Sequence, residues 1–283
     1  MPSLRTCDGR TLAWREAGAG PPLLCHAGGP GASAAYFGGL DELAAERTLL
    51  LLDPRGTGAS DRPADPSGYA LEAYAADIEA VREALGLDTL DVLGHSHGGF
   101  VAITWAGTHP ERVGRLVLAS TAPRFTDAIR TRRRERVAAH AGQPYFADAV
   151  AALEDQQAGR YGGDAELMAL YERAGPVLVP PGGDVAPIAA ALRSAGINAD
   201  ALRHFNEHIA GTMDLRPLLA HITAPTLVIA GEIDPFGGPT SDEIVAALPQ
   251  ATVVSILGAD HFPFLEAEHR AAWSRAILDF LAG

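Results

Sequence analysis

A serine flanked by glycines forms the clearest chemical pattern in this sequence. The segment Gly94–Gly99 reads GHSHGG, so Ser96 is the centre of a Gly-x-Ser-x-Gly pattern. The apolar run Leu90–Leu93 precedes it, and the segment Phe100–Thr108, which has helical character, follows it. A sharp strand-to-helix turn requires glycine neighbours because a Cβ there would clash, and it projects the serine hydroxyl outward in a strained conformation. The pattern therefore predicts that Ser96 is a nucleophile.

A serine hydroxyl needs a base to take its proton and an acid to orient that base. His261 follows the apolar run Thr252–Leu257, and Asp234 follows the run Pro225–Ala230. Both residues come directly after predicted strands, where parallel sheets place functional side chains. We therefore predict a catalytic triad of Ser96, Asp234 and His261.

Two other interpretations of these acidic residues are open. Asp260 directly precedes His261 in the chain. Adjacent residues rarely face one another, so Asp234 is the better candidate to orient the base. Asp234 could instead be an ordinary turn residue before Pro235, but its place after a strand favours the triad.

A glycine-rich segment, Gly28–Gly31 (GGPG), follows the apolar run Pro22–Cys25. Acyl transfer places negative charge on the carbonyl oxygen of the substrate, and preorganised N–H donors stabilise that charge. We expect one donor to be the N–H of His97, the residue after the nucleophile, and the other to come from Gly29 or Gly28. A plain tight turn would also use Gly and Pro, but the serine pattern favours an oxyanion hole.

The charge composition excludes several other kinds of site. All 22 basic residues are Arg, against 35 acidic residues, which gives a formal charge of −13. Without lysine the chain cannot form a lysine Schiff base or a Walker A phosphate site. Its acidity argues against nucleic-acid binding. We expect a small-molecule or short-peptide substrate instead.

Metal and membrane binding are not predicted either. His204 and His208 are four residues apart but lack a third nearby ligand, so they are expected to be ordinary helix residues. We therefore expect no metal and no cofactor. The first residues lack the apolar segment of a signal peptide, and no apolar run is long enough to span a membrane. These features predict a cytoplasmic protein.

Short apolar runs alternate with amphipathic segments over residues 10–119 and again over residues 225–281. The predicted strands are Arg10–Glu16, Pro22–His26, Thr48–Asp53, Leu90–Leu93, Arg115–Ala119, Pro225–Ala230 and Thr252–Leu257. The predicted helices are Tyr36–Ala45, Tyr69–Leu85, Phe100–Thr108, Asp242–Leu248 and Glu266–Leu281. This alternation predicts an α/β protein with a mostly parallel sheet and helices on both faces.

The alternation is interrupted in the middle of the chain, where helical segments occur without a convincing strand. We predict a core domain formed by residues 1–122 and 214–283, and an inserted helical cap, or lid, formed by residues 123–213. The cap contains the basic run Arg130–Arg136 (RTRRRER). In so acidic a protein we interpret this run as a solvated helix face.

These motifs together resemble the α/β-hydrolase fold and, more narrowly, the proline iminopeptidase family of serine peptidases. The resemblance covers almost the whole chain and rests on five segments: Gly28–Ser33 (GGPGAS), Asp53–Ser60 (DPRGTGAS), Gly94–Gly99, Gly231–Asp234 (GEID) and the segment around His261. It implies a helical cap over the sheet. It also implies an aminopeptidase that releases an N-terminal residue, preferably proline, from short peptides with Ser, His and Asp.

The resemblance further implies two residues that bind the substrate amine. The segment Asn206–Thr212 is similar to the family's stretch at the end of the cap, where a glutamate holds the ammonium group; this residue is Glu207 here. A second family glutamate lies two residues before the catalytic aspartate, and Glu232 has that position. Two carboxylates in a partly buried pocket would attract a cation. Both residues could instead be solvated surface glutamates.

The sequence departs from the family pattern at two positions. Ala27 separates His26 from the GGPG segment, and His97 replaces a bulky aromatic residue after the nucleophile. Both changes border the predicted oxyanion hole. An esterase, a lactonase or an amide hydrolase with the same triad is therefore an alternative, and so is a non-catalytic homologue that binds a small molecule.

Overall fold

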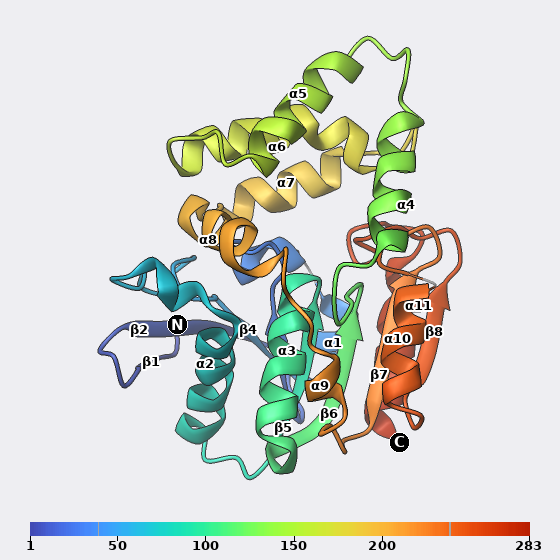
Figure 1. Ribbon diagram of the computed structural model, residues 1–283. Coiled ribbons are helices and arrows are strands. Elements are labelled where there is room, and N and C mark those ends of the chain that lie inside the picture. The colour runs from blue at the N-terminus through green and yellow to red at the C-terminus, as the bar shows by residue number, and fades with distance from the viewer. Residues whose placement is uncertain (39, 238) are drawn as a thin grey trace.

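The computed structural model describes residues 1–38, 40–237 and 239–283, and it contains one eight-stranded sheet (Figure 1). The order across the sheet is β1-β2-β4-β3-β5-β6-β7-β8, with β1 and β2 antiparallel to their neighbours and the other strands parallel. The strands are β1 (Ser3–Arg5), β2 (Thr11–Ala17), β3 (Pro22–His26), β4 (Thr48–Leu52), β5 (Leu90–His95), β6 (Val113–Ala119), β7 (Thr226–Gly231) and β8 (Thr252–Ile256). The predicted α/β architecture with a mostly parallel sheet is confirmed.

Side chains alternate between the two faces of the sheet, and each face has its own hydrophobic core. In β3, for example, Leu24 belongs to one core, whereas Leu23 and Cys25 belong to the other. This alternation follows from the two-residue period of a strand, and burial on both faces explains why the strand sequences are continuously apolar. Helices can therefore pack against both faces of the sheet.

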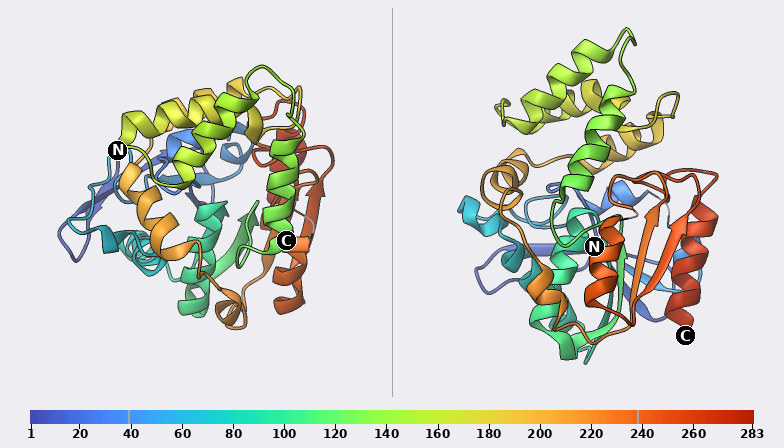
Figure 2. Two further views of the ribbon diagram at one scale, coloured as in Figure 1. Left: turned by 45° about the horizontal axis from the view of Figure 1, so that its top comes forward. Right: turned by 45° about the vertical axis from the view of Figure 1, so that its right-hand side comes forward.

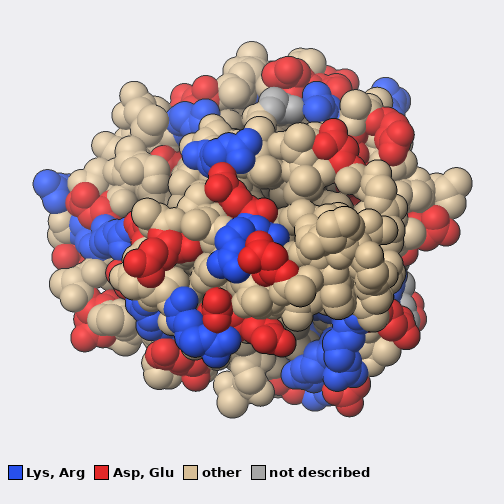
Figure 3. Space-filling view, turned by 90° about the horizontal axis from the view of Figure 1, so that it is seen from above, with Lys and Arg blue, Asp and Glu red and all other residues tan. Residues whose placement is uncertain are grey.

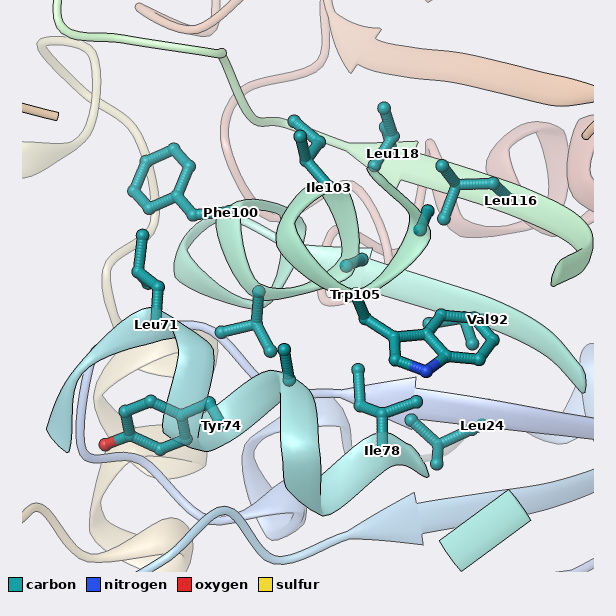
Figure 4. Packing of buried hydrophobic residues seen from close by; sticks show 14 of the residues in the cluster. Leu24, Leu71, Tyr74, Ile78, Val92, Phe100, Ile103, Trp105, Leu116 and Leu118 are labelled. Atoms are coloured by element: carbon teal, nitrogen blue, oxygen red, sulfur yellow. The ribbon is translucent and has the colours of Figure 1, made fainter. Parts of the chain in front are cut away.

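One face of the sheet is covered by α2 (Leu71–Ala84) and α3 (His97–Thr108), as Figure 4 shows. The short α9 (Arg216–Leu219) and α10 (Pro239–Ala247) extend this layer. The side chains at its centre include Leu71, Tyr74, Ile78, Phe100, Ile103 and Trp105 from the two helices, and Leu24, Val92, Leu116 and Leu118 from the strands. The other face is covered by α1 (Asp41–Ala44) and α11 (Arg270–Ala282).

One predicted helix is wrong in detail, and one strand of the structure was not predicted. The segment predicted as one helix, Tyr36–Ala45, is a 3-10 turn over Ala34–Phe37 followed by the short α1. Gly38 ends the turn because its φ of 63° lies in the left-handed region, which favours glycine. Strand β1 was not predicted, since its three residues include no buried side chain and no apolar run.

The segment between β6 and β7 folds into helices, and none of its residues, all of them described, forms a strand. The helices are α4 (Asp127–Ala138), α5 (Phe146–Gln157), α6 (Asp164–Leu178), α7 (Ala186–Ala195) and α8 (Ala199–His204), followed by a π-helical turn, Phe205–Ile209. They have a hydrophobic core of their own and lie above the sheet in Figures 1 and 2. We call these helices the cap; its exact boundaries at 123 and 213 stay a prediction.

The cap is joined to the sheet domain at Asn198, a buried residue just before α8. The Asn198 N–H donates to Gly31 O at 2.8 Å, and its side-chain amide donates to Gly56 O at 2.9 Å and to the Tyr69 hydroxyl at 2.8 Å. Its side-chain oxygen accepts from the Asp200 and Ala201 N–H groups in the first turn of α8. Asn198 therefore fixes the cap over the glycine-rich segment that follows β3.

Arginine and acidic side chains are interspersed over the face seen from the cap side in Figure 3. The only basic residues there are arginines, because the chain has no lysine. Among the described helices, none combines the length and apolar character needed to cross a membrane.

Candidate active site

Ser96 lies at the turn between β5 and α3, with φ 55° and ψ −117°. Its N–H donates to Ala119 O at 2.9 Å, which ties the turn to the end of β6. Glycine is required on both sides of the turn. A Cβ on Gly98 would lie 2.2 Å from His26 O, and a Cβ on Gly94 would lie 2.3 Å from Gly98 O. The Gly-x-Ser-x-Gly pattern thus has the predicted strand–turn–helix geometry.

Three residues that are distant in the sequence meet at the Ser96 hydroxyl. The His261 ring lies with Nε2 at 3.1 Å from Ser96 Oγ and with Nδ1 at 3.0 Å from Asp234 Oδ1. The Asp234 carboxylate accepts a hydrogen bond from the Nδ1–H group of His261, which leaves Nε2 free to accept the serine proton. This is the geometry that a nucleophile, a base and an orienting acid require.

Asp234 is fully buried and is held as a carboxylate by its neighbours. Burial by itself would raise the pKa of this carboxyl group, but the His261 ring and the Phe236 N–H, 2.9 Å from Oδ1, outweigh it, so that the pKa lies below the ordinary value. Asp260, the competing acid, does not bind the His261 ring. Its Oδ2 instead accepts a hydrogen bond from Arg136 at 2.6 Å.

The backbone N–H groups predicted to form the oxyanion hole differ in whether another group of the protein already accepts their hydrogen bond. The Gly28 N–H donates to the Tyr36 hydroxyl at 3.0 Å, so the expectation that Gly28 supplies a donor is not supported. Instead, Gly28 allows close packing, since a Cβ there would lie 3.0 Å from Ser96 Cβ. Within the described part of the chain, the Gly29 N–H has no hydrogen-bond acceptor. His97 begins α3, where backbone N–H groups have no acceptor within the helix.

His95 is a buried residue of the site that the sequence did not single out as functional. Its Nδ1 is hydrogen-bonded to the Tyr36 hydroxyl, and its Nε2 lies 2.8 Å from His261 O. Burial lowers the pKa of His95 to about 3, so the ring is neutral at physiological pH. A neutral ring that donates from Nε2 to His261 O accepts at Nδ1 from the hydroxyl of Tyr36. His95 thus connects the Gly28 segment to the loop that carries His261.

A cavity of about 340 Å³ lies between Ser96 and the cap. Most of its wall is apolar, and α6 and α7 supply much of it. The charged groups in this wall are Glu172 and Arg193, whose side chains form an ion pair at 3.1 Å and are about half exposed. The apolar cap side chains in the wall are Met168, Pro176, Leu178, Val179, Val185, Ile188, Ala189, Leu192 and Ile197.

The two glutamates predicted to bind an amine do not lie at this cavity. The side chain of Glu207 is 57 % exposed, and its carboxylate lies 3.8 Å from His208 Nε2. Glu232 is exposed, and its Oε2 accepts a hydrogen bond from the Gly258 N–H at 3.0 Å. Neither residue belongs to the cavity wall. The structure therefore does not bring Glu207 and Glu232 together as an amine site.

No cluster of three or more His, Cys, Asp or Glu side chains suited to a metal ion occurs among the residues that the structure describes. His204 and His208 lie with their ring centroids 4.9 Å apart, but no third candidate ligand completes a group.

Comparison with known proteins assigns the chain to a family. The family model described as alpha/beta hydrolase fold matches residues 21–268. The chain belongs to the alpha/beta hydrolase fold family.

Relatives within this family carry different enzyme names. The chain is 31% identical over 255 residues to a 2-(acetamidomethylene)succinate hydrolase from Mesorhizobium japonicum, with 89% of this chain and 85% of that protein aligned. It is 37% identical to a proline iminopeptidase from Heyndrickxia coagulans over 105 residues, which are 37% of this chain and 36% of that protein. The chain thus matches only about a third of the length of this relative, and the finer assignment to the proline iminopeptidase family is not confirmed.

Solved structures agree with the fold. A hydrolase from Pseudomonas aeruginosa PA01 has a TM-score of 0.69 and 31% identity, with 100% of this chain and 98% of that chain covered. An esterase from Exiguobacterium antarcticum has a TM-score of 0.75 at 21% identity, with 99% of both chains covered, and shows the shared fold only.

Proposed function

We propose that this protein is a serine hydrolase in which Ser96, His261 and Asp234 form the catalytic triad. The observation that carries the proposal is the continuous hydrogen-bonded series from Ser96 Oγ through the His261 ring to Asp234, which opens into the cavity under the cap. Membership of the alpha/beta hydrolase fold family supports it.

The proposed reaction proceeds through an acyl-enzyme. His261 Nε2 accepts the proton of Ser96 Oγ as that oxygen attacks the substrate carbonyl, and Asp234 stabilises the imidazolium that forms. The N–H groups of Gly29 and His97 stabilise the negative charge on the carbonyl oxygen, each contributing roughly 3 kcal/mol. His261 then protonates the leaving group. In the second half of the reaction it activates a water molecule that releases the acyl group from Ser96.

Within this class we propose a small substrate with an apolar acyl group, joined as an ester or a lactone. The apolar wall of the cavity supports this proposal, because an apolar wall favours an uncharged group over an ammonium ion. The alternative of a small-amide substrate uses the same triad, and its acyl group would occupy the same wall.

A second candidate is an aminopeptidase of the proline iminopeptidase type. Its support is the local identity of 37% to 43% over 105 residues with such enzymes. Because Glu207 and Glu232 lie away from the cavity, the carboxylate available to a substrate ammonium is Glu172, the acidic residue of the cavity wall. In this candidate Glu172 would exchange its partner Arg193 for the substrate amine.

A substrate panel with matched variants tests both candidates. We expect wild-type protein to hydrolyse p-nitrophenyl butyrate and small lactones faster than the 2-naphthylamide of proline. Faster turnover of the prolyl arylamide, with a selective loss in Glu172→Gln, would favour the aminopeptidase instead. Acetylated prolyl arylamide, which lacks the cationic amine, is the control substrate for that loss.

The triad itself is tested with Ser96→Ala. We expect this variant to lose turnover by about 10⁴-fold or more while its circular dichroism spectrum is unchanged. A fluorophosphonate probe should label wild-type protein at Ser96 and should not label the variant. Absence of labelling together with tight binding of a small molecule would instead support a non-catalytic binding protein.

A further inference from the structure

The basic run of α4 reaches the two loops that carry the acid and the base of the site. Arg136 Nη1 donates to Asp260 Oδ2 at 2.6 Å, and its Nη2 donates to Ile233 O, also at 2.6 Å. Asp260 directly precedes His261, and Ile233 directly precedes Asp234. Figure 1 shows α4 descending from the rest of the cap toward this end of the sheet. One guanidinium therefore contacts both loops.

The ion pair between Arg136 and Asp260 is largely shielded from solvent. The Arg136 side chain is 11% exposed and the Asp260 side chain is 9% exposed. The expectation that the run Arg130–Arg136 is simply a solvated helix face is wrong for Arg136. Arg132 also points toward the sheet domain and donates to Gly237 O and Glu232 O. Arg134, by contrast, donates a hydrogen bond to Thr131 within α4.

We propose that Arg136 is a positioning residue of the hydrolase site: it holds the Asp234 and His261 loops in place and offsets the negative charge of Asp260 beside His261. The inference rests on the proposed function, because it assigns a consequence to the proton transfer at His261. The two residues that it concerns, Arg136 of the cap and Asp260, act through His261 and not through Ser96.

The charges around His261 explain the second role of Arg136, which is to offset the negative charge of Asp260. The charged groups that face the His261 loop are Asp234 after β7, Asp260 in the loop itself and Arg136 on α4. Two further charged groups bind the backbone of this loop: Glu232 accepts a hydrogen bond from the Gly258 N–H, and Arg270 of α11 donates one to Phe264 O. Glu266 lies farther along the same loop, with Oε1 at 3.2 Å from the Asp260 N–H, and is paired with His269 at 3.5 Å. His95, from β5, is neutral. Arg136 is thus the permanent cation that pairs with Asp260, the carboxylate directly before His261.

Loss of Arg136 would leave Asp260 as an unpaired buried carboxylate. Its second oxygen, Oδ1, is already buried without a hydrogen-bond partner among the described residues. Burial raises the pKa of the Asp260 carboxyl group, while the hydrogen bond from Arg136 opposes that rise. An unpaired negative charge next to His261 would stabilise the protonated, inactive form of the base.

The test compares the pH dependence of kcat/KM in two single variants. For Arg136→Gln we expect the acid limb of the profile to move to higher pH, by roughly half a unit, because a positive charge near the base is lost. For Asp260→Asn we expect a shift of similar size to lower pH, because a negative charge is lost. The double variant should have an acid limb close to that of the wild type.

Opposite shifts distinguish this role from a purely structural one, which would lower kcat at every pH and leave the limb in place. Unmoved limbs in both single variants would overturn the proposal. The matched control is Arg134→Gln, which removes an arginine of the same helix that contacts no loop and should leave the profile unchanged. If Arg136→Gln does not fold, Arg136→Lys keeps the charge and should retain the wild-type limb with a lower kcat. A shifted limb in that lysine variant would contradict the charge argument.

Fluorophosphonate labelling separates this inference from the proposed function. Wild-type protein that is labelled at Ser96, combined with unmoved acid limbs, would refute the role of Arg136 alone. Wild-type protein that is neither labelled nor active would refute the hydrolase proposal itself.

Discussion

At the scale of single residues, the choice between Asp234 and Asp260 depends on where each carboxylate finds its partner. Asp234 is buried with Oδ1 toward the His261 ring, whereas Asp260 turns toward the cap and pairs with Arg136. The sequence favours Asp234 only because adjacent residues rarely face one another. The structure adds the positive reason, which is that a cationic side chain from the cap binds the other carboxylate.

Replacement of Asp234 by Asn tests this difference. The amide has a similar size but donates a hydrogen bond where the carboxylate accepts one, so it favours the wrong tautomer of His261. We expect Asp234→Asn to lower kcat by about 10⁴-fold. Asp260→Asn, measured at the pH optimum with the same ester, should lower it far less. Comparable losses in the two variants would show that both carboxylates orient the base.

The residues of the site differ in how well the sequence alone predicts them. Ser96, His261 and Asp234 each follow a recognisable apolar strand, so local patterns are enough to nominate them. Tyr36 and His95 are not nominated in this way. His95 occupies a variable position of the Gly-x-Ser-x-Gly pattern, and the importance of both residues comes from a buried contact between segments far apart in the chain. Glu207 and Glu232 were nominated by resemblance, and resemblance does not fix which way a surface side chain points.

At the scale of elements, the turn from β5 into α3 depends on how closely that helix approaches β3. The sites of closest approach are glycines, and Gly98 lies against the backbone carbonyl of His26. The strand and the helix can be predicted from their apolar residues. The exact position of Ser96 above the sheet cannot, because it depends on this packing. The position of Ser96 depends on contacts with β3, which lies about seventy residues earlier in the chain.

We expect Gly98→Ala to destabilise the protein by about 1–3 kcal/mol, because its Cβ would lie 2.2 Å from His26 O and the backbone must shift. The same shift should displace the His97 N–H and lower kcat. Urea denaturation and steady-state kinetics measure the two effects. Gly211→Ala is the control, since a Cβ there meets nothing within 4 Å. Equal stability in both variants would contradict the close-packing argument.

At the scale of the whole molecule, the cap and the sheet domain enclose the site together. The strand and helix pattern predicts the sheet and the position of the insertion in the chain. It does not predict how the cap packs on the sheet domain, because that arrangement depends on single long-range contacts such as those of Asn198 and Arg136. Such contacts involve residues that are unremarkable in their local sequence.

Three buried histidines should make the folded protein sensitive to acid. Burial lowers the pKa of His26 to about 4 and the pKa values of His95 and His97 to about 3. The unfolded chain binds protons at these residues near pH 6.5, whereas the folded protein does not. Stability should therefore be greatest above pH 6.5 and fall as the pH is lowered, by up to about 1.4 kcal/mol per pH unit for each histidine.

Urea denaturation between pH 7 and pH 4.5 measures this loss. His97→Gln should reduce the slope of the unfolding free energy against pH by about 1.4 kcal/mol per pH unit, which corresponds to one proton. A slope that is the same in wild-type protein and His97→Gln would show that this histidine is not buried in its neutral form.

The backbone of Ser96 has a consequence for how far this fold can be stabilised. Its φ of 55° and ψ of −117° lie outside the regions that residues with a Cβ prefer, at an energetic disadvantage of about 1–3 kcal/mol. The surrounding contacts, rather than the preference of the residue itself, hold it there. Activity and stability thus oppose each other at this position. Glycine adopts that conformation more easily, so the most stable version of this turn would be one that has lost its nucleophile.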